Sequence, residues 1–276
     1  MHFPFTKMEG AGNDFILSTA SAEEFTPELI SRLCHRKFGI GADGIIFVQA
    51  LGEEGERAIL QMRYFNSDGS YAAMCGNGLR CSASFAWKNG LSNGKKKMLF
   101  HSGTLTAPAE ILDDTGEMVQ ILLEAGEDFR EYREEDGTLL YKGVVGVPHA
   151  IIKVSSAELE ELDADKRGQK YRFSPLFAPE GANIDFLSFT EEERKKGICH
   201  IRTYERGVEG ETLACGTGCA SSGIVLHDFF DFPEKIRMIC RCGTEIGIDI
   251  LKECNILKRV LLTGPAKSIF TGSTEI

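Results

Sequence analysis

The sequence repeats itself at a constant offset of 140 residues, about half of its 276-residue length. The clearest copy is a Cys-Gly-x-Gly segment, which occurs at Cys75–Gly78 and again at Cys215–Gly218. Chance matches would scatter over many offsets, so one shared offset predicts two similarly folded halves. Further matches at this offset are Gly41-Ala42-Asp43 with Gly181-Ala182-Asn183, Tyr64 with Tyr204, Ser82 with Ser222, Lys95 with Lys235, Met98 with Met238, and Gly103-Thr104 with Gly243-Thr244.

The two halves are predicted to comprise residues 1–120 and residues 121–263. We expect their boundary near Glu117–Tyr141, where Glu-rich and Gly-containing sequence interrupts the patterned segments. An approximate twofold relation between the halves would let equivalent residues face each other across a shared cleft. The two Cys-Gly-x-Gly segments are then candidates for one active site.

Each half is predicted to be mostly strand with one or two helices, which is an α+β fold. Pro27–Phe38 is predicted to be a helix that Thr26 caps. A second, buried helix is predicted after each Cys-Gly-x-Gly, at Leu79–Trp87 and at Cys219–Phe230, the first ending at Lys88-Asn89-Gly90. The predicted strands include Ala58–Phe65, Thr104–Leu112, Ile198–Tyr204 and Thr244–Leu251.

Charge and composition exclude several classes of protein. The 31 Lys and Arg against 41 Asp and Glu give a net charge of −10, which argues against nonspecific nucleic-acid binding and against a membrane-surface protein. Two basic runs, Lys95–Lys97 and Arg194–Lys196, are predicted to be solvated turns. The sequence has no stretch of apolar residues long enough for a transmembrane helix, and Met1–Gly10 is unlike a secretory signal.

Nine cysteines are an odd number, and their spacing is irregular. This argues against a disulfide framework and predicts free thiols in a reducing cytosol. Most free cysteines are small buried apolar residues. That structural role is predicted for Cys34, Cys81, Cys199, Cys219, Cys240, Cys242 and Cys254.

A Cys-Gly-x-Gly segment before a buried helix has a specific chemistry. The first N–H groups of a helix have no intrahelical partner and, with the helix dipole, attract an anion such as a carboxylate. The same position stabilises a thiolate, which makes the cysteine a better base. Two such thiols on opposite faces of one carbon could invert its configuration, one removing a proton while the other returns one. The helix N–H groups would stabilise the negative charge that develops on the carboxylate.

Three other kinds of site fit the sequence less well. A zinc site of Cys215, Cys219, Cys240 and Cys242 lacks the usual C-x2-C spacing. A Cys–His hydrolase using His149 would leave the second Cys-Gly-x-Gly unexplained. A nucleotide site lacks both G-x-x-x-x-G-K-[ST] and a strand-linked G-x-G-x-x-G.

At these residues the sequence resembles the diaminopimelate epimerases, which are cofactor-independent amino-acid epimerases. The resemblance extends over nearly the whole chain, and the motifs are in order. The matching segments are Lys7–Phe15, Gly39–Gly44, Phe65–Ser70, Met74–Cys81, Pro148-His149, Gly181–Asn183, Tyr204–Gly207, Glu211–Gly218 and Leu262–Ala266.

The resemblance implies two pseudo-symmetric halves, each a β-rich, barrel-like sheet around a central helix, with the active site in the cleft between them. It implies that residues 264–276 pack back on the first half. It also implies a homodimer, with Phe270 where the family places an aromatic residue at the subunit contact.

The activity that the resemblance implies is interconversion of LL- and meso-2,6-diaminopimelate, in lysine and peptidoglycan synthesis, without pyridoxal phosphate or a metal. Cys75 and Cys215 match the catalytic cysteines, and His149 and Glu205 match residues that tune the protonation of the thiols. The matching substrate-binding residues are Asn13, Asn66, Gly76, Asn77, Asn183, Glu205, Arg206, Gly216 and Thr217.

The sequence departs from the family pattern at three places. Val147 replaces the Asn that often precedes Pro-His, Gly44 stands where some members have Gln, and Val208–Gly210 is one residue longer than in many members. These departures affect recognition of the distal end of the substrate and not the two thiols. A racemase of another amino acid, such as histidine, and a non-catalytic amino-acid-binding protein therefore remain alternatives. Opposed thiols also predict inactivation by oxidation.

Overall fold

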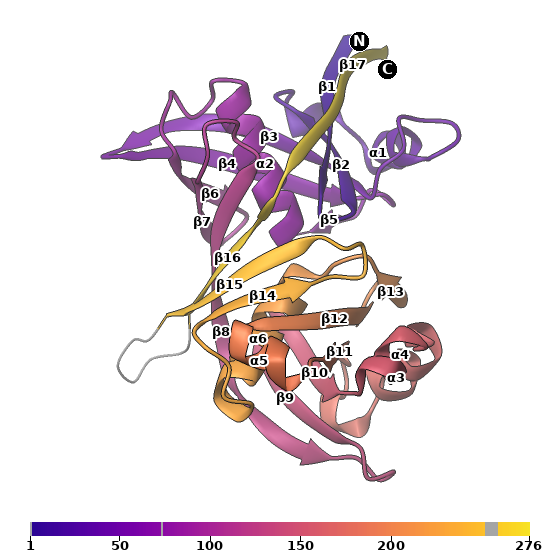
Figure 1. The fold of residues 1–276 in the computed structure, drawn as a ribbon. Helices are drawn as coiled ribbons and strands as arrows, with labels where there is room; N and C mark the ends of the chain where they lie inside the picture. Colours follow the sequence, from indigo (N-terminus) through magenta and orange to yellow (C-terminus); the bar gives the residue numbers. More distant parts are fainter. Residues whose placement is uncertain (1, 73, 252–258) are drawn as a thin grey trace. The chain divides into compact units, whose positions relative to one another are not determined.

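A computed structural model describes residues 2–72, 74–251 and 259–276. The chain divides into two compact units, Met1–Ile121 together with Gly264–Ile276, and Leu122–Thr263. It enters the second unit within strand β8 (Met118–Arg133) and returns to the first within strand β16 (Arg259–Pro265). Figure 1 shows a long helix within each unit, surrounded by strands of that unit.

The division between the two units, after Ile121, falls inside the expected boundary segment Glu117–Tyr141, but the expected interruption of the pattern there is wrong. The segment is a continuous strand and the start of its hairpin partner β9 (Leu139–Val145). The acidic residues of β8 are exposed, whereas Val119, Ile121 and Phe129 are buried. The register of β8 against β9 shifts between Ala125 and Glu127 and between Glu127 and Arg130, so neighbouring residues such as Glu127 and Asp128 can both be exposed.

The first unit is a sheet built around helix α2 (Gly76–Lys88). The helix packs against strands from both ends of this unit's chain. Parallel pairing joins the second strand to the third and the fourth to the sixth, and the other pairs are antiparallel. The strands are β1 (His2–Gly10), β2 (Asn13–Ser18), β3 (Gly44–Glu54), β4 (Arg57–Asn66), β5 (Tyr71–Ala72), β6 (Lys97–Ser102), β7 (Leu105–Ile111) and β17 (Lys267–Glu275).

The second unit repeats this arrangement around helix α6 (Gly216–Phe229). Its strands, besides β9, are β10 (Val147–Lys153), β11 (Asn183–Ser188), β12 (Ile198–Glu205), β13 (Gly210–Thr212), β14 (Lys235–Ile239) and β15 (Glu245–Leu251). The parallel pairs β10–β11 and β12–β14 correspond to β2–β3 and β4–β6. The predicted α+β class and the two pseudo-symmetric halves, each a barrel-like sheet around a helix, are confirmed.

The two central helices are buried, as predicted, but each begins three residues before its expected start. Gly has low helix propensity, which placed the predicted starts too late. In the structure Cys75 and Cys215 are the N-cap residues, and each sulfur atom accepts a hydrogen bond from one of the first backbone N–H groups of its helix.

Helix α1 (Pro27–Cys34) ends four residues before its predicted end. The Thr26 cap is confirmed, because its side chain accepts a hydrogen bond from Leu29 N at 3.3 Å. Beyond Cys34, the His35 ring accepts hydrogen bonds from the backbone N–H groups of residues 37 and 38, each at 3.1 Å. This turn ends the helix and leads the chain toward Gly41, whose φ is +79°.

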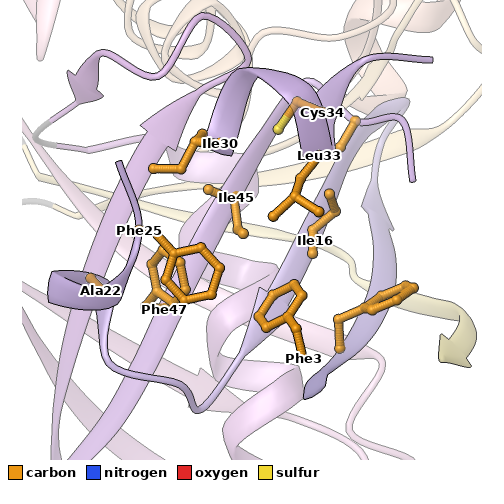
Figure 2. Packing of buried hydrophobic residues seen from close by; sticks show 11 residues of the cluster. Phe3, Ile16, Ala22, Phe25, Ile30, Leu33, Cys34, Ile45 and Phe47 are labelled. Carbon is orange, nitrogen blue, oxygen red and sulfur yellow. The ribbon is translucent and has the colours of Figure 1, made fainter. Parts of the chain in front are cut away.

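A core cluster fixes α1 on the first sheet. Ile30, Leu33 and Cys34 of α1 lie over Ile16 of β2 and Ile45 of β3 (Figure 2). This packing holds the loop after α1 beside the amino end of β3. The other buried members of the cluster are Phe3, Phe5, Ala22, Phe25, Ala42 and Phe47.

The predicted turn at Arg194–Lys196 is wrong, because these residues form the last turn of α5 (Glu191–Lys196). Thr190 and Glu193 make a capping box, and Gly197, at φ +66°, ends the helix. No residue of α5 is buried, so the predicted solvation is correct. Lys97, in the other basic run, begins β6. The remaining elements are η1 (Ala22–Glu24), α3 (Ser156–Glu160), α4 (Ala164–Arg172) and η2 (Pro175–Phe177).

Candidate active site

Both central helices begin with the same cysteine cap. The Cys75 sulfur accepts a hydrogen bond from Gly78 N at 3.5 Å, and the Cys215 sulfur accepts one from Gly218 N at 3.4 Å. Both cysteines have extended backbones, with φ and ψ of −141° and 121° for Cys75 and −118° and 116° for Cys215. Each thiol therefore lies at the positive end of a helix dipole, beside the first N–H groups of the helix.

In the second unit, a buried chain of polar groups leads away from Cys215. The Cys215 sulfur lies 3.4 Å from Thr217 Oγ1, which lies 3.1 Å from His149 Nε2. His149 Nδ1 lies 2.7 Å from Asp185 Oδ2, and neither side chain is exposed. The other carboxylate oxygen of Asp185 accepts a hydrogen bond from Thr203 Oγ1 at 2.7 Å.

This environment keeps the proton on Cys215. Burial raises the pKa of the Cys215 thiol well above its ordinary value, and the carboxylates of Glu205 and Asp185 raise it further. The hydrogen bond that Cys215 shares with Thr217 and the one it accepts from Gly218 N act in the opposite direction but have smaller effects. Cys215 is therefore a thiol at neutral pH and is suited to donating a proton.

Asn183 connects this thiol to the end of β12. Its Nδ2 lies 3.9 Å from the Cys215 sulfur, and its Oδ1 accepts a hydrogen bond from Arg206 N at 2.8 Å. The Arg206 guanidinium forms an ion pair with Glu180 at 3.3 Å. Glu205, the last residue of β12, is near enough to raise the pKa of Cys215. The second unit thus brings together Asn183, Cys215 and Thr217, with Glu205 close by.

In the first unit the amide groups near Cys75 form a different chain. Asn77 Nδ2 donates to Asn13 Oδ1 at 2.5 Å, and Asn13 Nδ2 donates to Asp43 Oδ2 at 3.0 Å. Arg80, which is fully buried, donates to Asn77 Oδ1 at 2.9 Å. These contacts fix which amide groups of Asn13 and Asn77 donate and which accept.

Asn66 lies at the end of β4, and its Nδ2 donates to Ser70 Oγ at 3.0 Å. Gly44 pairs with Asn66 across β3 and β4. A Cβ atom on Gly44 would lie only 2.4 Å from the carbonyl oxygen of Phe65. This close backbone approach leaves no room for a side chain at position 44 of this chain.

The sequence did not single out Asp185, Asp43 or Arg80. Asp185 follows Asn183 by two residues on β11, so the two share a face, and the parallel pairing of His149 with Asn183 places the histidine beside them. The alternation was visible in the sequence, but the strand register was not. Asp43 occupies the repeat position of Asn183.

The remaining cysteines differ in exposure. Cys34, Cys81, Cys199, Cys219 and Cys240 are buried, as their predicted structural role requires. Cys242 is exposed, so the prediction of a buried residue is wrong there: it lies in the turn between β14 and β15. The sulfur atoms of Cys219 and Cys240 are 3.7 Å apart. Cys254 lies outside the described residues.

Residues 2–72, 74–251 and 259–276 contain neither a candidate metal site nor a candidate membrane span. Within these ranges no group of three or more His, Cys, Asp or Glu side chains is placed to hold a metal ion. In the same part of the chain, no helix combines the length and the apolar character that crossing a membrane requires.

Solved structures with this fold include racemases. The crystal structure of a phenazine biosynthesis protein of the PhzF family from Bacillus anthracis matches with a TM-score of 0.76 and 15% sequence identity, over 100% of both chains. A probable proline racemase from Agrobacterium radiobacter matches with a TM-score of 0.66 and 12% identity, over 99% of this chain and 92% of the other. At this level of identity the two likenesses establish a shared two-unit fold.

Sequence comparison gives a narrower assignment. A sequence model described as diaminopimelate epimerase matches residues 5–126. A diaminopimelate epimerase from Hydrogenobaculum sp. is 35% identical, over 97% of this chain and 96% of that protein. Another, from Archaeoglobus fulgidus, is 33% identical, over 99% and 96%. The chain belongs to the diaminopimelate epimerase family and is an isomerase.

Proposed function

We propose that this enzyme interconverts LL- and meso-2,6-diaminopimelate, in lysine and peptidoglycan precursor synthesis, with Cys75 and Cys215 as its two bases. The family assignment supports the substrate. The observation that carries the mechanism is the cysteine cap at the start of both central helices. Neither a structural cysteine nor a simple binding site requires the same cap twice.

The reaction is a balanced exchange of protons. One thiolate removes the proton from the α-carbon, and the electron pair moves into the adjacent carboxylate. The opposite thiol then donates its proton to the other face of the same carbon, which inverts the configuration. The N–H groups at the helix starts, at Gly76-Asn77 and Gly216-Thr217, stabilise the charge on the substrate carboxylate.

Substrate recognition uses the side chains near the two caps. Asn13, Asn66 and Asn183 are proposed to bind polar groups of the substrate, with Glu205 beside the reacting centre. Arg206 is proposed to bind a carboxylate bidentately, exchanging its ion pair with Glu180 for the substrate. Val147, at the first position of β10, offers no side-chain hydrogen bond. Selectivity for the distal group is therefore proposed to come from the other residues.

Deuterium exchange tests the reaction directly. The reduced protein is incubated in D2O with LL-diaminopimelate, histidine, glutamate, lysine or lanthionine, and deuterium and chirality are followed together. Inversion with deuterium uptake is expected for diaminopimelate alone. Inversion of another amino acid would move the function to a different racemase, and no exchange with any of them would support the binding-protein alternative.

The two thiols are tested by Cys75→Ala and Cys215→Ala. Each variant is expected to lose epimerisation by at least about 1,000-fold, because inversion requires both a base and an acid. The control is Cys199→Ala, a buried cysteine of β12. Full epimerase activity in either folded active-site variant would refute the two-base mechanism.

The proposed assembly is a homodimer formed through β17, where Ile269 and Phe270 are about half exposed. Phe270→Glu is expected to raise the dimer dissociation constant by about 30-fold or more, since a buried aromatic residue at an interface contributes about 2 kcal/mol. Sedimentation velocity over a concentration series measures this, with Tyr71→Glu as an exposed aromatic control. A monomeric wild-type protein would contradict the proposal.

The free cysteines support a cytoplasmic location for this enzyme.

A further inference from the structure

We propose that Asp185 is a positioning residue of the reaction: it holds His149 so that Thr217 can pass the Cys215 proton to the histidine and back. The proposal rests on the proposed role of Cys215 as one of the two bases. It gives a function to two side-chain groups, the Asp185 carboxylate and the Thr217 hydroxyl, that substrate binding through the backbone does not use.

The geometry of the four groups determines where the protons lie. Asp185 and His149 are fully buried and 2.7 Å apart, so an ionised Asp185 requires the proton of His149 to be on Nδ1. His149 Nε2 is then an acceptor and takes the hydrogen of Thr217 Oγ1, 3.1 Å away. The Thr217 oxygen in turn accepts from the Cys215 thiol, 3.4 Å away.

Protons can move along this chain of hydrogen bonds in either direction, and the four groups together neither gain nor lose a proton. The thiol proton of Cys215 moves to Thr217 Oγ1, and the Thr217 proton moves to His149 Nε2. The products are a Cys215 thiolate and a His149 imidazolium, whose positive charge the Asp185 carboxylate stabilises. Cys215 can thus become a base while its proton remains in the protein, ready to return when the thiol must act as an acid.

Asp185 is held in an orientation that lets its carboxylate stabilise the His149 imidazolium. Its second oxygen accepts a hydrogen bond from Thr203 at 2.7 Å, which fixes the plane of the carboxylate. Among the described residues, other titratable groups near Cys215 include Glu205 at the end of β12 and Cys219 on α6. The Cys219 thiol is kept protonated, because its neighbour Cys240 and burial raise its pKa.

The position equivalent to Thr217 differs in the first unit. The residue two positions after Cys75 is Asn77, whose amide bonds to Asn13 and Arg80. An amide does not take up and release protons at neutral pH. The two cysteine caps have the same backbone geometry, but the side chain two positions on is a hydroxyl after Cys215 and an amide after Cys75.

Four variants test the role of Asp185. Asp185→Asn can donate to Nδ1, which moves the histidine proton to Nε2 and blocks acceptance from Thr217. We expect kcat to fall by about 100-fold or more with KM changed by less than about threefold, by analogy with other histidines deprived of their carboxylate. Thr217→Val removes the bridging hydroxyl and is expected to give a similar loss, whereas Thr217→Ser keeps the hydroxyl and is expected to retain most activity. The double variant D185N/T217V is expected to be no slower than the slower single variant.

Alkylation separates this inference from the substrate assignment. The rate at which iodoacetamide modifies Cys215 is followed against pH by peptide mass spectrometry, without any substrate. Loss of the proton path predicts slower modification in Asp185→Asn and Thr217→Val at neutral pH, and a wild-type rate in Thr217→Ser. Faster modification in Asp185→Asn would overturn the proposal, since it would show that the carboxylate acts only as a neighbouring negative charge. Retention of kcat within about threefold in folded Asp185→Asn would overturn it as well.

Discussion

At the scale of single residues, cysteine has two distinct roles in this chain. Cys75 and Cys215 cap helices and bond to backbone N–H groups, whereas Cys34, Cys81 and Cys199 are packed in cores. In the packed group, burial raises the pKa of the thiol because a thiolate would lose its hydration. The contribution of each of these thiols to the free energy of unfolding is therefore complete only at a pH where the thiol is protonated in the unfolded chain as well.

This dependence predicts a pH effect at Cys34. Burial raises its pKa from the ordinary value of 9.0 to about 12. Above pH 9 the unfolded chain loses the Cys34 proton while the folded chain keeps it, so the free energy of unfolding falls as the pH rises. The contribution is complete below pH 9 and is lost between pH 9 and 12, at about 1.4 kcal/mol per pH unit.

Urea unfolding of the wild type and of Cys34→Ala at pH 8, 9, 10 and 10.5 measures this effect. The difference between the two proteins is expected to change by about 1.4 kcal/mol per pH unit above pH 9, whatever its value at pH 8. Cys242→Ala is the matched control, because Cys242 is exposed in the folded protein. Parallel pH dependence in Cys34→Ala and the wild type would show that the Cys34 thiol ionises equally in both states.

Some residues of the candidate site can be predicted from the sequence, and others cannot. Cys75 and Cys215 are predictable because their chemistry depends on neighbours along the chain, namely glycines and a helix start. Asp185 is not, because its role depends on the register of β10 against β11. A long-range pairing of this kind has no signature in the local sequence.

At the scale of elements, the two central helices have the same cap but different surroundings. A Cβ atom on Gly218 would lie 2.4 Å from Asp185 Oδ1, whereas one on Gly78 would lie 3.0 Å from the Ile46 Cδ1 methyl group. The predicted strands and helices were correct in type, because alternation and capping are local signals. Their ends were less accurate: glycines hid the helix starts, and the His35 turn shortened α1.

The different surroundings predict unequal effects of adding one methyl group. Gly218→Ala displaces a carboxylate that Thr203 and His149 hold, so it is expected to lower kcat by at least about tenfold more than Gly78→Ala. Gly78→Ala meets the end of a flexible side chain, which can move. Steady-state kinetics of both variants, after circular dichroism has shown that they fold, measures the difference. Equal losses would show that the glycines serve only the backbone of the cap.

At the scale of the whole molecule, the internal repeat is the sequence feature that predicts most about the fold. Both units have the same strand order around a helix, with parallel pairs at equivalent positions. The repeat could be found because cap and turn residues are retained: Gly41 and Gly181 both have positive φ, +79° and +72°. The strand character of β8 could not be found in the same way, because exposed acidic residues and shifts in its register against β9 interrupt the alternation.

A two-base mechanism requires Cys75 and Cys215 to reach opposite faces of one carbon, and this predicts the products of oxidation. Diamide takes two electrons and two protons from a pair of thiols that can approach within disulfide distance, and is itself reduced to the hydrazine. We expect loss of activity, a Cys75–Cys215 cross-linked peptide in mass spectrometry, and full recovery with dithiothreitol. Bound diaminopimelate is expected to slow the oxidation because it separates the two thiols.

A second pair of thiols makes this experiment decisive. Cys219 and Cys240 have sulfur atoms 3.7 Å apart within the second unit, so they are the competing site of oxidation. Cys240→Ala removes the competitor without altering either cap, and diamide is expected to inactivate this variant as it does the wild type. If Cys240→Ala instead resists inactivation, the loss of activity comes from the Cys219–Cys240 disulfide. That result would contradict the predicted Cys75–Cys215 disulfide but not the proton exchange, because two sulfur atoms on opposite faces of a substrate carbon lie farther apart than a disulfide allows.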